Sequence, residues 1–128
     1  MSVIKPLEEN EAEGQAAKIY ANLRKTLGFI PNTYKAMAHK PEFLQALLGM
    51  DHAVFAEGVL DAKTKELIAI AVSAANGCQY CLSAHAALAQ KAGADTKEMT
   101  EALSVAAVMS AYNSFNKAIG LDIDIKPE

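Results

Sequence analysis

The sequence of 128 residues has no tryptophan, only four prolines and no long hydrophobic run. Its longest strongly apolar stretch, Leu67 to Ala75, is far shorter than the roughly 20 residues that cross a bilayer. The opening residues, MSVIKPLEENEAEG, lack the basic and apolar regions of a secretory signal peptide. We therefore expect a cytoplasmic protein with no membrane association.

The sequence also lacks an excess of basic charge. It has 12 lysines and arginines against 15 aspartates and glutamates, interspersed along the chain, for a net charge of -3. Proteins that bind nucleic acids show a basic patch or stripe, because the phosphate backbone must be neutralised. Nucleic acid is therefore not an expected partner.

Strand-forming patterns are scarce as well. Apolar residues make up 52% of the chain and charged residues 21%, the balance of a soluble globular protein. The apolar share depends on alanine and leucine, which favour helices over strands. The length is that of one domain. The sequence therefore predicts an all-α fold with a single domain over residues 1–128.

Proline and glycine divide the chain into about six predicted helices. Asn32 and Asp61 are expected helix N-caps, and Asp95 with Glu98 forms a capping box. The tail 121–128 is expected to be irregular. The predicted helices cover residues 13–27, 32–39, 41–57, 62–76, 78 or 79 to 92, and 96–119.

Three predicted helices carry unusual apolar surfaces. The third has one continuous apolar face, formed by Phe43, Leu47, Met50 and Val54. Residues 67–72 are apolar on every side, which is typical of a central helix covered all round. The last helix has more apolar surface than one core contact needs. It is either buried centrally or makes subunit contacts.

Cys78 and Cys81, followed by His85, are the candidate chemical centre. Cytoplasmic proteins seldom keep structural disulfides, so a close cysteine pair is more often catalytic or metal-binding. On one helix the three side chains would fall within about 60° of one another. Helix N-terminal amides and a neighbouring base favour the thiolate, and a second thiol can resolve a sulfenic acid. The trio therefore indicates a thiol redox centre that reduces peroxides.

Glu66 is a candidate fourth member of this centre. If the helices on either side of Gly77 form an antiparallel pair, Glu66 and His85 differ by three residues in their distance from the turn. That difference is about 4.5 Å along the axis, within side-chain reach. A carboxylate beside wholly apolar turns needs a partner. We expect Glu66 to pair with His85.

The run from Glu66 through Cys78-Gln79-Tyr80-Cys81 to His85 resembles the E-x11-C-x-x-C-x3-H pattern of the alkylhydroperoxidase AhpD-like group. This group lies within the wider carboxymuconolactone decarboxylase family. The resemblance extends over most of the chain, with further landmarks at residues 28–32, 41–42 and 89–93.

The resemblance implies a helical subunit that assembles into trimers or hexamers through helix packing. It also implies a thiol-dependent peroxidase in which Cys81 attacks the peroxide, Cys78 resolves, and Glu66 with His85 relays protons. Proximity to the helix terminus alone would favour Cys78 as the more acidic thiol, whereas proximity to His85 favours Cys81. Tyr80 stands where AhpD has a further histidine, and tyrosine is a poor base at neutral pH.

Such an enzyme would use a hydroperoxide as substrate and a dithiol, lipoyl- or thioredoxin-like reductant, with no cofactor or metal. Other hypotheses remain open at this stage. They are a zinc site built from the same four residues, a carboxymuconolactone-type decarboxylase, and a non-enzymatic thiol-disulfide sensor or metal-binding oligomer. His39 and His52 are expected at the surface. Four further apolar residues are expected either to line an entrance to the thiols or to pack in the core. They are Phe29, Ile30, Tyr34 and Phe55.

Overall fold

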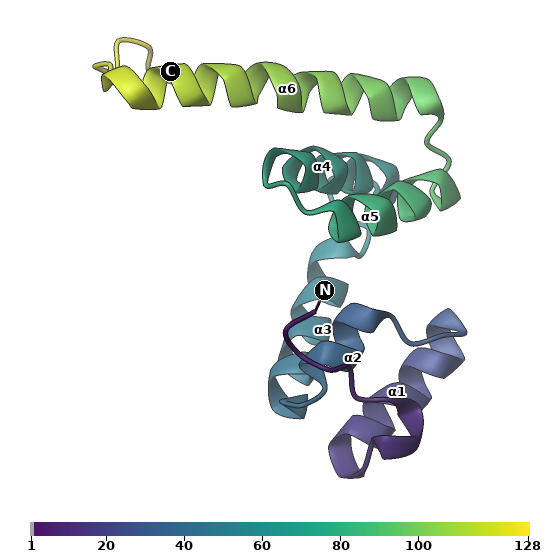
Figure 1. The fold of residues 1–128 in the computed structure, drawn as a ribbon. Coiled ribbons are helices and arrows are strands. Elements are labelled where there is room, and N and C mark those ends of the chain that lie inside the picture. The colour runs from purple at the N-terminus through teal and green to yellow at the C-terminus, as the bar shows by residue number, and fades with distance from the viewer. Residues whose placement is uncertain (1) are drawn as a thin grey trace. The chain divides into compact units, whose positions relative to one another are not determined.

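The computed structural model describes residues 2–128, which form helices and no β-strand (Figure 1). This confirms the predicted all-α class with six α-helices. No helix within the described residues is long and apolar enough to span a bilayer. In chain order the elements are a short 3-10 helix η1 (Glu9–Glu11), α1 (Gly14–Leu27), α2 (Asn32–Met37), α3 (Pro41–Phe55), α4 (Ala62–Ala75), α5 (Gln79–Lys91) and α6 (Thr96–Ile119).

Side-chain capping explains where α4 and α6 begin. The Asp61 side chain accepts a hydrogen bond of 2.8 Å from the Thr64 N–H at the start of α4. Asp95 and Glu98 form the predicted reciprocal capping box at the start of α6. The predicted cap at Asn32 is wrong. Pro31 is the N-cap of α2, because its carbonyl accepts the first hydrogen bonds of that helix.

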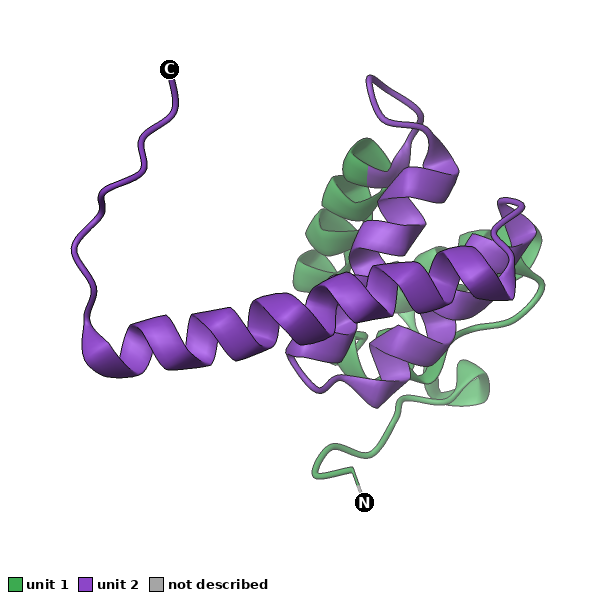
Figure 2. Cartoon of the chain, turned by 90° about the horizontal axis from the view of Figure 1, so that it is seen from above, with its two compact units in different colours: residues 1–54 green, residues 55–128 purple. Residues whose placement is uncertain are grey.

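The chain divides into two compact units (Figure 2). The first ends at Val54 and the second begins at Phe55. The expectation that residues 1–128 form a single domain stays a prediction.

The first unit is built on α1, α2 and α3 up to Val54. Its N-terminal segment is held by two hydrogen bonds of Leu7, one from the Tyr20 hydroxyl to the Leu7 carbonyl (2.7 Å) and one from the Leu7 N–H to the Lys35 carbonyl (3.0 Å). Burial raises the pKa of the Tyr20 phenol. The core residues of the unit are Ala16, Ile19, Tyr20, Leu23, Ile30, Ala38 and Leu44.

The apolar face predicted for α3 does not supply this core. Leu44 is fully buried, whereas Phe43 is 50% exposed, and Met50 and Val54 are also exposed. Leu48, one turn after Leu44, packs against the same core. The buried side of α3 therefore lies next to the predicted apolar face and not on it. The reason is that α1 and α2 cover the side of α3 that carries Leu44.

In the second unit, α4 packs against both α5 and α6. An ion pair of 2.7 Å between Lys63 and Glu98 also joins α4 to α6. The prediction that α4 is covered on every side is wrong, since Ile68 and Val72 are about half exposed. Packing against two helices leaves the remaining side of α4 open. The core of the unit is formed by Ile70, Ala89 and Ala94, with Leu67, Leu82, Ala86 and Met99 against them.

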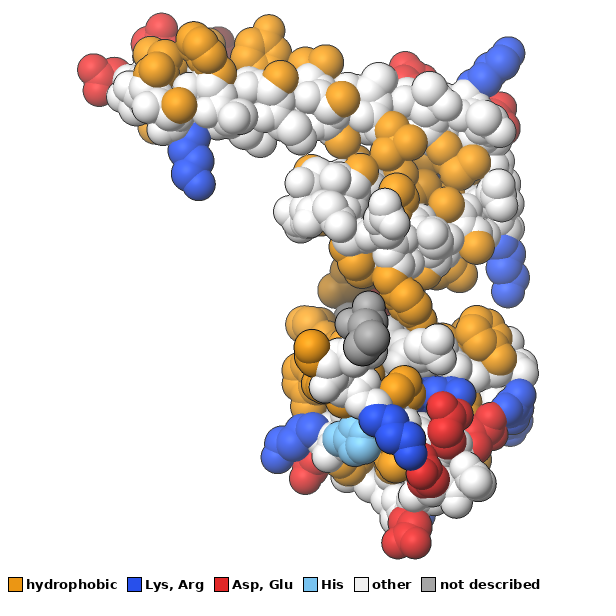
Figure 3. All heavy atoms as spheres, viewed as in Figure 1, with side chains coloured by type: hydrophobic (Ala, Val, Ile, Leu, Met, Phe, Trp, Pro, Cys, Tyr) orange, Lys and Arg blue, Asp and Glu red, His pale blue; other side chains and the backbone are white. Residues whose placement is uncertain are grey.

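The last helix, α6, packs on α4 with its first half and projects beyond α4 with its second half (Figure 1). Only Ala106 of α6 is buried, so the interpretation as a buried central helix is wrong. Apolar side chains gather along the projecting half (Figure 3). The tail after Gly120 has no regular structure, as predicted. The exposed large apolar residues of α6 are Leu103, Val105, Val108, Met109, Tyr112, Phe115 and Ile119.

Candidate redox site

The turn between α4 and α5 positions the cysteine pair. The Cys78 N–H donates to the Ser73 carbonyl (3.0 Å), and the Gly77 N–H donates to the Ala74 carbonyl (3.1 Å). These two bonds form a Schellman motif, which satisfies carbonyls at the end of a helix. The motif needs a left-handed residue, and Gly77 supplies it with φ of 72°. The chain therefore leaves α4 in a defined direction and places Cys78 directly before α5.

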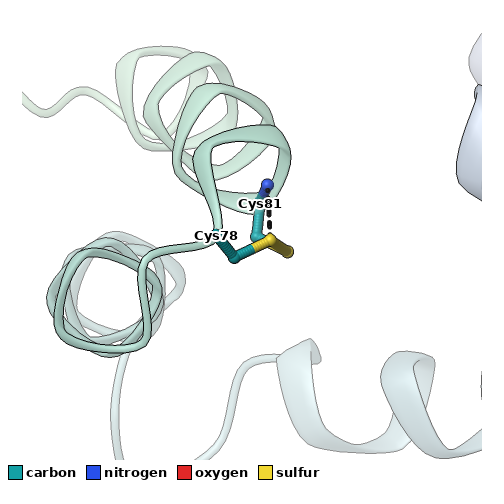
Figure 4. The surroundings of a disulfide bond; sticks show 2 residues. All are labelled: Cys78 and Cys81. Carbon is teal, nitrogen blue, oxygen red and sulfur yellow. Dashed lines mark hydrogen bonds between the residues drawn. A yellow bond between two sulfur atoms is a disulfide. The ribbon is translucent and has the colours of Figure 1, made fainter. Parts of the chain in front are cut away.

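Cys78 is the N-cap of α5, and Cys81 lies in the first turn of that helix. Their Cα atoms are 5.3 Å apart, and the two sulfurs form a disulfide (Figure 4). The Cys81 N–H donates to the Cys78 Sγ at 3.2 Å. Both sulfurs are thus at the N-terminus of a 13-residue helix, where the helix dipole favours negative charge. This arrangement suits a thiolate once the bond is reduced.

Glu66 and His85 form the predicted pair. The Glu66 Oε2 lies 2.7 Å from the His85 Nδ1, across the interface of α4 and α5. Glu66 is only 8% exposed, so the pair is largely shielded from water. The contact leaves Nε2 as the ring nitrogen available to a reacting group. In neutral His85, Nδ1 would donate to the carboxylate and Nε2 would be the acceptor.

Phe55 makes a contact that the sequence did not indicate. Its ring stacks on the His85 imidazole with centroids 5.3 Å apart and planes inclined by 20°. The other three residues predicted as an entrance or as core lie in the first unit. Ile30 is buried in the core of the first unit and Tyr34 packs against that core, while Phe29 is exposed. No periodicity links residues 55 and 85, which is why sequence patterns could not reveal this pair.

The first two turns of α5 also border an open hollow of ≈ 540 Å³, lined by Gln79, Tyr80, Ser83 and Ala84. Tyr80 is about half exposed, so its side chain is accessible at the helix that carries the cysteines. Within residues 2–128, no three His, Cys, Asp or Glu side chains are arranged to hold a metal ion.

The other two histidines lie in the first unit, exposed as expected. His39 Nε2 contacts the Lys5 carbonyl at 2.8 Å. His52 lines a hollow of ≈ 740 Å³ between α1 and α3.

The helices and the site can be compared with known proteins. The sequence model of the carboxymuconolactone decarboxylase family matches residues 41–122, which is more than half of the chain. The chain belongs to this family. The matched segment includes all four predicted site residues, Glu66, Cys78, Cys81 and His85.

Relatives within the carboxymuconolactone decarboxylase family include proteins named for peroxide reduction. The alkyl hydroperoxide reductase AhpD of Corynebacterium aurimucosum is 37% identical over 55% of this chain and 40% of its own length. The AhpD of Streptomyces griseus is 29% identical over 85% of this chain and 64% of its own length. The chain thus spans less than two thirds of either reductase. A Paracoccus denitrificans protein, named as uncharacterized protein 4 in the cox locus, is 40% identical over 59% of this chain and 71% of its own length.

A solved structure shares the fold of this family member. The alkylhydroperoxidase AhpD core from Rhodospirillum rubrum superimposes with a TM-score of 0.86 and 28% sequence identity. The match covers 97% of this chain and 95% of the other. The chain is therefore an AhpD-like member of the carboxymuconolactone decarboxylase family, with the fold that the motif implied.

Proposed function

We propose that this protein is a thiol-dependent peroxidase that reduces hydroperoxides through Cys78 and Cys81. The observation that carries the proposal is the disulfide at the N-terminus of α5, one helical turn before a histidine that is paired with a buried carboxylate. The AhpD names of its relatives support the same chemistry. Cys81 is assigned as the attacking thiol, because it is four residues from His85 on the same helix.

In the first step, the Cys81 thiolate attacks the terminal oxygen of a hydroperoxide. The S–O bond forms as the O–O bond breaks, so Cys81 is oxidised to a sulfenic acid and the peroxide is reduced to an alkoxide. The alkoxide takes up a proton and leaves as an alcohol, or as water when the substrate is hydrogen peroxide. His85, through Nε2, accepts the thiol proton beforehand and returns it to the leaving oxygen.

In the second step, the Cys78 thiol attacks the Cys81 sulfenic acid. The S–S bond forms, the S–O bond breaks and water leaves, which gives the disulfide. Two electrons and two protons from a dithiol, a lipoyl group or a thioredoxin-like protein then restore both thiols. Cys78 is well placed for this role, since its sulfur already lies at the N-cap beside the Cys81 amide.

Glu66 orients His85 in this cycle. A carboxylate at Nδ1 selects the tautomer with Nε2 as proton acceptor and stabilises the imidazolium that forms after proton transfer. The 2.7 Å contact and the burial of Glu66 support this role. Tyr80 is assigned no proton-transfer role, because an exposed phenol is a poor base at neutral pH.

We also propose that the protein is a cytoplasmic homo-oligomer, a trimer or hexamer, in which each chain acts as a single domain. Its α6 carries an exposed apolar stripe whose members are three and four residues apart in alternation, a spacing typical of helix-to-helix packing. The whole segment 102–119 contains one charged residue, Lys117. Such a surface is rarely left in water. The stripe consists of Val105, Val108, Tyr112, Phe115 and Ile119.

A peroxidase assay tests the function. Purified protein is supplied with hydrogen peroxide or cumene hydroperoxide and with dithiothreitol or dihydrolipoamide, and peroxide loss is followed over time. Wild type is expected to turn over many times, and Cys81→Ser is expected to lose turnover. Gln90→Ala, at an exposed side chain near the end of the same helix, serves as the control and should retain turnover. Full activity in Cys81→Ser would reject the assignment.

Two further measurements on the same purified protein distinguish the alternative functions. Loss of two thiols per chain with peroxide, reversed by dithiothreitol but without turnover, would indicate a thiol-disulfide sensor. Turnover of a carboxymuconolactone to carbon dioxide, unaffected by loss of both cysteines, would indicate a decarboxylase.

A further inference from the structure

The stacked pair of Phe55 and His85 extends the site beyond the four residues of the motif. Phe55 is the last residue of α3 and is only partly exposed, with its ring nearly parallel to the imidazole. Parallel, offset aromatic rings at about 5 Å attract each other by roughly 0.5–1.5 kcal/mol beyond the area that they bury. The contact can therefore hold a side chain in one orientation.

The backbone beside Phe55 is anchored to α4. Lys65 donates a hydrogen bond from Nζ to the carbonyl of Ala56, the residue after Phe55. The Gly58 N–H donates to the Leu60 carbonyl and closes the following turn (3.2 Å). Glu66 is adjacent to Lys65 in α4. One turn of α4 thus fixes both the aromatic ring and the carboxylate that contact His85.

The two contacts restrain different motions of the imidazole. The hydrogen bond to the Glu66 carboxylate fixes the Nδ1 edge of the imidazole but permits the ring to tip about the line between the two residues. The Phe55 ring lies against one face of the imidazole and prevents that tipping. Together the two contacts restrict the imidazole to one orientation, in which Nε2 points in a single direction. Small errors in the orientation of a catalytic group are costly, since a misplacement of about 1 Å can reduce a rate about a hundredfold.

We infer that Phe55 is a positioning residue, which holds the plane of His85 so that Nε2 faces the proton of the attacking thiol. This inference rests on the proposed function, since it assigns His85 the proton transfer. Phe55 itself touches no reacting atom. Its role requires a flat ring at this position and not merely an apolar side chain of similar volume.

The test compares Phe55→Leu and Phe55→Met, which are apolar without a ring, with Phe55→Tyr, which keeps the ring. The peroxidase assay is run on the full chain, and KM and kcat are determined separately. We expect the two ring-less variants to lose about tenfold to a hundredfold in kcat with little change in KM. Phe55→Tyr should retain a kcat within about threefold of wild type. Phe43→Leu, at a half-exposed phenylalanine of the first unit, is the matched control and should be silent.

A second measurement does not depend on peroxide turnover. In the Cys78→Ser background, the reduced Cys81 thiol is alkylated with iodoacetamide between pH 5 and 9. Loss of the ring should shift the pH profile of the rate, whereas Phe55→Tyr should leave it in place, because the ring holds His85 near the sulfur and leaves the helix N-terminus unchanged. If wild type reduces no peroxide yet the profile depends on the ring, the proposed function fails and the positioning role stands. If leucine, methionine and tyrosine variants match wild type in both measurements, the positioning role is rejected.

Discussion

Glu66 of α4 and His85 of α5 are 19 residues apart in the chain, yet their side chains meet at 2.7 Å. The Schellman turn at Gly77 makes this possible, because it reverses the chain and places the two helices side by side. The same turn delivers Cys78 to the N-cap of α5. One local backbone motif therefore positions both the cysteine pair and the contact between Glu66 and His85.

Replacing the carboxylate tests the pair directly. Glu66→Gln keeps the size and a hydrogen bond to His85 but removes the charge that supports the imidazolium. We expect kcat/KM for hydroperoxide to fall by about tenfold to a thousandfold, the range of general acid-base effects. Glu101→Gln, at an exposed carboxylate of α6, is the control and should change little. Equal activity of both variants would show that Glu66 has no role in turnover.

A trapped intermediate can identify which of the two thiols attacks the peroxide and which one resolves the sulfenic acid. In Cys78→Ser, the Cys81 sulfenic acid has no resolving thiol and should accumulate with one equivalent of peroxide. Dimedone labels sulfenic acids, and mass spectrometry of the peptide identifies the labelled residue. We expect a label on Cys81 in Cys78→Ser and little label on Cys78 in Cys81→Ser. The reverse pattern would make Cys78, favoured by its N-cap position, the attacking thiol.

Adjacent residues of α3 give a stability test of the first unit. Leu44→Ala should lower the free energy of unfolding by about 2–5 kcal/mol, because it opens a cavity at a fully buried site. Phe43→Ala, at the half-exposed neighbour, should cost less than about 1 kcal/mol. Urea unfolding followed by circular dichroism measures both. A larger loss of unfolding free energy for Phe43→Ala than for Leu44→Ala would mean that the predicted apolar face of α3 is buried, and not the side that carries Leu44.

The capping box of α6 predicts a dependence on pH. The Lys63 ammonium and the Asp95 N–H hold the pKa of the Glu98 carboxyl below its ordinary value. A carboxyl with a lower pKa in the folded state contributes stability above its unfolded pKa, near 4, and loses it as the pH falls through the folded value. Wild type should therefore unfold at higher urea than Glu98→Gln at pH 7, and the difference should shrink below pH 4. A constant difference from pH 7 to pH 3 would contradict the linkage.

The apolar stripe of α6 predicts self-association. Phe115→Asp places a charge within the stripe and should reduce the molar mass found by size-exclusion chromatography with light scattering, because a buried unpaired charge is costly. Ser114→Asp adds the same charge at the neighbouring exposed position, away from the stripe, and should leave the mass unchanged. A monomeric wild type, or equal effects of both variants, would reject an interface on this stripe.

Local features of the fold could be predicted because they depend on residues that are close in the chain. Asp61, Asp95 with Glu98, and the glycine after α4 determine helix ends through their own backbone and side-chain bonds. The contact of Glu66 with His85 also followed from counting residues on each side of Gly77, since a tight turn makes the register of two helices nearly unique. The prediction of Asn32 as a helix cap was wrong, because the N-cap of α2 lies one residue earlier, at Pro31.

The amino-acid sequence by itself determined the helical class, the boundaries of most helices and the four motif residues Glu66, Cys78, Cys81 and His85. The tertiary structure alone decided which apolar residues are covered: Leu44 rather than Phe43, one side of α4 rather than all, and little of α6. It also decided that Phe55 stacks on His85. The physical reason is that capping and turns are interactions between chain neighbours, whereas burial depends on which helices arrive at each face. Periodicity identifies an apolar face but does not identify the surface that covers it.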